Sequence, residues 1–86
     1  MGAHESISVT VTNRLGLHAR PAMSFVDLAA TFKCAVTVRR DETVVDGKSI
    51  MQMMMLAATQ GSVLEITAEG EDSGAALAAL RALVER

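Results

Sequence analysis

Short segments of alternating apolar and polar residues, separated by helical patterns, constrain the architecture of this chain most strongly. The first runs from Ile7 to Thr12 and is typical of a half-buried strand. Similar strand patterns follow at 35–39, 43–45 and 63–68. Apolar residues at helical spacing predict three helices. The first follows a loop at 13–16 and runs to about Phe32, a short one covers 50–54, and a last one begins after Asp72 or Ser73.

The order of these elements is β-α-β-β-α-β-α. Eighty-six residues, half of them hydrophobic, suffice for one core, so we expect a single domain over 1–86. The solution that buries every apolar face is an α+β fold. It consists of a four-stranded antiparallel sheet with three helices on one face.

Composition excludes several classes of function. The net charge of −2 and the two aromatic residues argue against nucleic-acid binding, which needs a basic excess and bases stacked on rings. No apolar run approaches the roughly 20 residues that span a bilayer, and the first residues do not resemble a secretion signal. Cys34 is alone, which suits a reducing compartment, and we interpret it as a small buried hydrophobe. A cytoplasmic protein without membrane contact is expected.

The sequence Gly-Leu-His-Ala-Arg-Pro-Ala at 16–22 places a histidine at the start of the first predicted helix. Pro21 suits a first helical turn, where its missing N–H costs nothing. Backbone N–H groups there lack intrahelical partners and form an anion site. A histidine with an ordinary pKa of about 6.5 offers a nitrogen lone pair near neutral pH. His18 could therefore accept a phosphoryl group while Arg20 receives its oxygens.

The same seven residues resemble the active-site signature of the histidine-containing phosphocarrier (HPr) family of the phosphoenolpyruvate-dependent sugar phosphotransferase system. The resemblance implies an open-faced sandwich and a carrier without a cofactor, rather than a self-sufficient enzyme. It implies that phosphorylated enzyme I donates to Nδ1 of His18 and that a histidine of an enzyme IIA domain accepts. Arg20 would stabilise the phosphate, and Asn13, Gly16 and Ala19 would form the loop around the site.

Lys48-Ser49-Ile50-Met51 resembles the family segment that carries a regulatory serine. A serine kinase and phosphorylase acting on Ser49 are then further partners, although Ser49 could equally be only the N-cap of the short helix. Gln52 stands where regulated members usually have glycine, and Asp27 is a second departure from the common pattern. The resemblance also places an apolar docking patch here, for which Met51 and Met54 are candidates.

Three alternatives remain beside the sugar phosphocarrier. One is a paralogous carrier of a nitrogen-related or regulatory phosphotransfer chain. Another is a module in which His18 and Arg20 hold an anion without covalent chemistry. A metal-binding protein is disfavoured because His4, His18 and Cys34 show no ligand spacing. A monomer is expected in each case.

Overall fold

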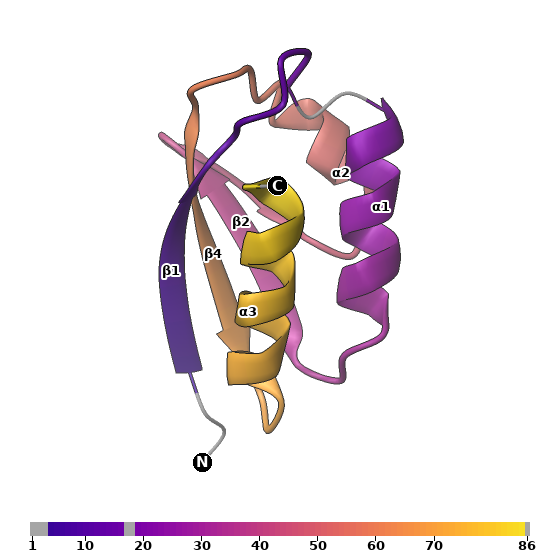
Figure 1. Cartoon of the computed structure of the whole chain (residues 1–86). Helices are drawn as coiled ribbons and strands as arrows, with labels where there is room; N and C mark the ends of the chain where they lie inside the picture. Colours follow the sequence, from indigo (N-terminus) through magenta and orange to yellow (C-terminus); the bar gives the residue numbers. More distant parts are fainter. Residues whose placement is uncertain (1–3, 17–18, 86) are drawn as a thin grey trace.

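The seven expected elements follow one another in the expected order (Figure 1). The computed structural model describes residues 4–16 and 19–85, with only the backbone of Ala19. The elements are β1 (His4–Thr10), α1 (Ala19–Ala30), β2 (Ala35–Arg40), β3 (Thr43–Asp46), α2 (Ile50–Met55), β4 (Val63–Glu69) and α3 (Ser73–Val84).

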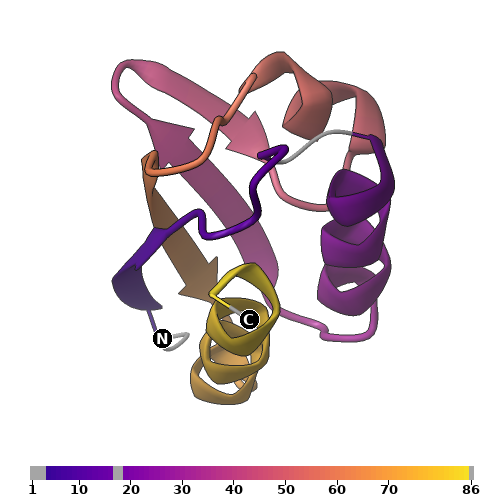
Figure 2. The same ribbon diagram turned by 45° about the horizontal axis from the view of Figure 1, so that its top comes forward.

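The four strands form one antiparallel sheet in the order β1-β4-β2-β3. Val9 lies opposite Leu64, and Val38 lies opposite Ile66, so these four buried side chains share one face. The three helices lie on that face (Figures 1 and 2). The predicted fold class, an open-faced α+β sandwich, is confirmed.

The other face of the sheet is mainly polar, with Val44 and Val63 as exposed apolar residues on it. The hydroxyls of Ser6 and Thr67 are hydrogen bonded at 2.8 Å across β1 and β4. The guanidinium of Arg39 lies 3.3 Å from the carboxylate of Glu65 across β2 and β4. Such cross-strand pairs fix register on an uncovered face, while the alternating apolar residues fill the core.

The helix faces expected from the spacing are those that pack on the sheet. In α1, Ala22, Phe25 and Ala29 are wholly buried. The corresponding buried face of α3 comprises Ala76, Leu77, Leu80 and Val84. The α1 helix ends at Ala30 rather than near Phe32, because Thr31 and Phe32 donate to carbonyls only three residues back.

Asp72 occupies the N-cap position of α3, but its carboxylate bonds elsewhere. It accepts hydrogen bonds from the backbone N–H of Lys33 at 2.8 Å and of Cys34 at 2.9 Å. These bonds, with that from Lys33 the strongest, hold the pKa of Asp72 below its ordinary value. Cys34 is buried as expected, and burial raises the pKa of its thiol. Asp72 therefore ties the loop before β2 to the start of α3.

Side chains of α2, of α3 and of Glu85, the residue directly after α3, form hydrogen bonds with backbone groups at both edges of the sheet. At β1, Thr10 N–H donates to the Glu85 carboxylate at 3.2 Å, and Arg81 donates to the Ser8 carbonyl at 3.2 Å. At β3, Asp46 N–H donates to Oε1 of Gln52 at 2.8 Å. These bonds attach α3 and α2 to opposite edges.

Candidate functional site

A tight turn leads from β1 toward α1. Gly16 N–H donates to the Asn13 carbonyl at 2.9 Å, and the Asn13 side-chain oxygen accepts from Leu15 N–H at 3.1 Å. Gly16 has φ +72, in the left-handed region that favours glycine. Asn13 and Gly16, both expected in the site loop, thus define its conformation.

This loop rests on the segment that follows α2. Val11 N–H donates to the Ser62 carbonyl at 2.9 Å, and Gly61 N–H donates to the Val11 carbonyl at 2.8 Å. A Cβ atom on Gly16 would collide with the carbonyl oxygen of Ala58. The close approach of two backbones explains why glycine stands at this position.

The α1 helix begins directly after the loop. Its first turn contains Arg20 and Pro21 and no acidic residue. Arg20 is exposed, and no hydrogen bond or ion pair joins its side chain to residues 4–16 or 19–85. His18 lies outside the described residues, as does the side chain of Ala19. Arg20 is therefore available to an anion beside the start of α1.

Positive charge gathers locally in a chain whose net charge is −2. Arg14 and Arg20 lie between residues 13 and 26, a stretch without a carboxylate. Arg14 is exposed in the turn that precedes α1. Sequence reasoning missed Arg14, although its charge and its distance of four residues from His18 could have identified it.

Ser49 is the N-cap of α2, as predicted. Its hydroxyl accepts a hydrogen bond from Gln52 N–H at 3.3 Å. Gln52 itself reaches back to Asp46 through its side chain. At the other end of α2, Arg40 donates to the carbonyls of Leu56 at 3.0 Å and Ala57 at 3.2 Å. Both ends of this short helix are thus held by specific bonds.

Methionines divide between the two faces of α2. Met51, Met54 and Met55 are 79%, 48% and 71% exposed, whereas Met53 is wholly buried. Their i, i+3, i+4 spacing places the three exposed side chains on one face. Met51 and Met54 were expected on a surface. Met55 was missed, although this spacing could have indicated it.

Two further exposed apolar side chains were also missed, Leu15 in the site loop and Met23 in α1. The α1 and α2 helices contact each other. The site loop, α2 and the start of α1 lie side by side at one end of the molecule (Figures 1 and 2). Arg20 therefore stands among exposed apolar side chains, whereas Asp27 is exposed farther along α1.

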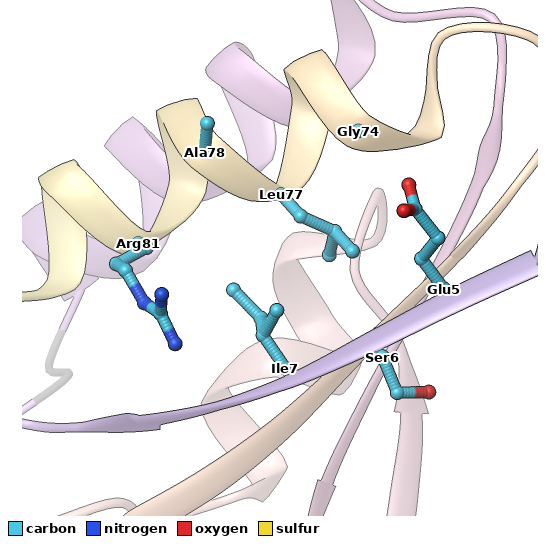
Figure 3. Close-up of a pocket in the computed structure, with 7 residues that line it drawn as sticks. All are labelled: Glu5, Ser6, Ile7, Gly74, Leu77, Ala78 and Arg81. Atoms are coloured by element: carbon cyan, nitrogen blue, oxygen red, sulfur yellow. The ribbon is translucent and has the colours of Figure 1, made fainter.

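A separate groove runs between β1 and α3 (Figure 3). Ile7 and Leu77 point toward each other at its floor, and Ser6 points away from α3. Glu5 accepts a hydrogen bond from the Ser73 hydroxyl at 3.1 Å, while Arg81 donates to the Ser8 carbonyl. The charged groups along this groove thus have partners within the chain. Over residues 4–16 and 19–85 there is no cluster of three or more His, Cys, Asp or Glu that could hold a metal ion.

Known proteins resemble this chain over nearly its whole length. Residues 5–86 match the family described as PTS HPr component phosphorylation site. Phosphocarrier protein HPr of Pseudomonas aeruginosa is 49% identical over 80 residues, covering 92% of this chain and 89% of that protein. Phosphocarrier protein NPr of Proteus mirabilis is 46% identical over 78 residues, covering 90% and 87%.

The fold agrees with these sequence relationships. A crystal structure of a phosphocarrier protein HPr from Bacillus anthracis superposes with a TM-score of 0.92 at 43% identity, covering 95% of this chain and 98% of that one. None of the helices within the described ranges is long and apolar enough to cross a membrane. The chain therefore belongs to the HPr/NPr family of phosphocarrier proteins.

Proposed function

We propose that this chain carries a phosphoryl group on His18 between two proteins of a sugar phosphotransferase system. The observation that carries the proposal is the exposed Arg20 in the first turn of α1, two residues after His18 and within the matched phosphorylation-site family. Arg14 adds a second cation from the preceding turn. Asn13 and Gly16 fix the conformation of the loop that leads to the start of α1.

The chemistry requires little equipment in the carrier itself. A lone pair on Nδ1 of His18 attacks the phosphorus of phosphorylated enzyme I, an N–P bond forms, and the bond to the donor breaks. When a histidine nitrogen of an enzyme IIA domain attacks the same phosphorus, a new N–P bond forms, the N–P bond of His18 breaks, and the His18 ring is released for the next cycle. Phosphoryl transfer depends mainly on positioning and on neutralising the oxygen charge. Arg20 and the unpaired amides of α1 supply that neutralisation.

The carrier must bind its donor and its acceptor in succession. We assign Met51 and Met54 of α2 to this docking surface, because they are exposed at the same end of the molecule as Arg20. Flexible thioethers adapt to differently shaped partners. We further propose that the chain acts as a monomer in the cytoplasm, where both classes of partner would meet it.

Intact-mass spectrometry at neutral to alkaline pH tests the proposal. The chain is mixed with enzyme I, Mg²⁺ and phosphoenolpyruvate, and we expect a gain of one acid-labile phosphoryl group. His18→Ala should abolish the gain. His4→Ala is the matched control, since His4 is the other histidine and lies exposed at the start of β1. Labelling of His18→Ala at the normal rate would overturn the assignment, and an unlabelled wild-type chain would favour the anion-binding module.

A nitrogen-related carrier is the second candidate, because the relative named NPr is nearly as similar as the one named HPr. The phosphorylated chain would be offered separately to enzyme IIA domains of the sugar and nitrogen-related kinds. Faster loss of the phosphoryl group to the sugar type supports our first assignment. Faster loss to the nitrogen-related type would replace it.

We also propose Ser49 as a site of regulatory phosphorylation by a serine kinase, reversed by a phosphorylase. Its hydroxyl lies at the N-terminal end of α2, the helix that carries the exposed Met51 and Met54. A phosphate there would place negative charge beside the docking surface. Incubation with an HPr kinase and ATP, followed by phosphopeptide mapping, tests this assignment. Labelling that persists in Ser49→Ala would contradict it.

A further inference from the structure

We propose that the exposed face of α2 is a site of reversible methionine oxidation that weakens docking and so slows phosphoryl transfer. The site consists of Met51, Met54 and Met55. The inference rests on the proposed function, because it assigns a regulation to the docking surface of the carrier. Its chemistry, however, follows from the exposure of the side chains alone.

Solvent access separates these methionines sharply. Met51 and Met55 are 79% and 71% exposed, and Met54 is 48% exposed. Met53 lies within the same six-residue helix and is fully buried in the core. Thioether oxidation requires contact with the oxidant, so one short helix contains both reactive sites and a protected internal reference.

The oxidant is a peroxide. A lone pair on the methionine sulfur attacks one peroxide oxygen, an S–O bond forms as the O–O bond breaks, and water leaves after proton transfer. Sulfur loses two electrons, and hydrogen peroxide is reduced to water. Methionine sulfoxide reductases restore the thioether with a dithiol, which becomes a disulfide as the oxygen leaves as water. The modification is therefore balanced and reversible.

Oxidation would change the surface and leave the core intact. A sulfoxide is polar and chiral, so it disrupts an apolar interface that a flexible thioether would fit. Met53, Phe25 and Leu64 are wholly buried and stay in the core. The buried Cys34 is protected in the same way. A loss of transfer without unfolding is the expected outcome.

The test treats the full chain with graded hydrogen peroxide and then with dithiothreitol to reverse any thiol oxidation. Peptide mass spectrometry measures sulfoxide at each methionine, circular dichroism measures the fold, and the rate of phosphoryl uptake from enzyme I is measured before and after treatment. Methionine sulfoxide reductases are added to a portion of the oxidised sample.

We expect Met51, Met54 and Met55 to oxidise at least about tenfold faster than Met53. Phosphoryl uptake should fall by at least about fivefold, the scale set by the loss of apolar contact. The reductases should restore it while the far-ultraviolet spectrum stays constant throughout. Oxidation of Met53 at the same rate as the others would overturn the inference.

Two variants localise the effect, each compared with its own untreated sample. The triple variant Met51→Leu, Met54→Leu, Met55→Leu should lose its sensitivity to peroxide, although Met23 remains exposed. Met53→Leu should stay sensitive. An untreated wild-type chain that takes up no phosphate would overturn the proposed function and this inference together. Normal uptake that is unchanged after complete oxidation of the three residues would overturn this inference alone.

Discussion

The backbone of Gly16 approaches the carbonyl oxygen of Ala58 so closely that no side chain fits between them. One residue belongs to the loop before α1, and the other follows α2. This close approach adds to the hydrogen bonds that join the two segments bordering the candidate site.

Gly16→Ala should destabilise the chain by about 2–4 kcal/mol, because a Cβ there collides with backbone and alanine disfavours positive φ. Gly61→Ala is the matched control. Gly61 has φ +90, but nothing lies within 4 Å of its added Cβ, so only the conformational cost of about 1–2 kcal/mol remains. Denaturant unfolding measures both. Equal losses of stability in the two variants would show that the backbone around residue 16 accommodates the Cβ atom without a free-energy cost.

Ala57→Gly should stabilise the chain by up to about 1 kcal/mol. Ala57 has φ +50 just after α2, a conformation that glycine adopts without the clash of a Cβ atom. Part of the gain is offset by the greater freedom of glycine in the unfolded chain. Ala58→Gly is the contrasting variant, since Ala58 is buried and its methyl group is packed. Thermal unfolding that ranks Ala57→Gly below Ala58→Gly would contradict the prediction.

Ser49→Ala should lower the free energy of unfolding by about 1 kcal/mol, because it removes the oxygen that accepts the hydrogen bond from Gln52 N–H. Ser49→Asp retains a cap acceptor and should keep most of the stability. We expect Ser49→Asp to take up phosphate at His18 more slowly than Ser49→Ala, since only the aspartate adds charge at the docking surface. Stopped-time mass spectrometry of both variants decides this. Equal rates would argue against regulation through Ser49.

Asp72 should make stability depend on acid pH. Hydrogen bonds from Lys33 and Cys34 lower its pKa in the folded chain below the ordinary 3.8. The stabilisation is complete above the unfolded value and is lost as pH falls through the lower folded value. Asp72→Asn should therefore flatten the stability profile between about pH 5 and about pH 2. Asp27→Asn removes a carboxylate of the same kind from an exposed position on α1 and is the matched control for the loss of charge.

Periodicity was sufficient to predict the elements, their order and their buried faces. The alternation from Ile7 onward and the helical spacing of Ala22, Phe25 and Ala29 each mark the buried face of one element, and this information lies within the element itself. The structure begins β1 at His4, because its pairing with Glu69 extends the strand past the apolar residues. Pairing energy from a distant strand leaves no local pattern.

The features that the sequence could not predict all depend on distant partners. Asp72 looked like a helix cap, yet its carboxylate bonds to amides 38 and 39 residues away. The close approach of the Ala58 carbonyl to Gly16 can be known only from the fold, because the two residues are distant in sequence. The signature around His18 could be recognised in the sequence, because its residues are consecutive. The exposed face of α2 could be predicted in part. Spacing predicts that Met55 and Met51 share a face, but it does not predict which face of the helix packs against the core.

The bonds of Glu85, Arg81 and Gln52 at the sheet margins have a consequence for self-association. A strand edge with free amides and carbonyls is a template on which another chain can add its own strand. Here Thr10 N–H and the Ser8 carbonyl on β1, and Asp46 N–H on β3, already have side-chain partners. Addition of a strand from another chain is therefore discouraged at these positions on both edges of the sheet.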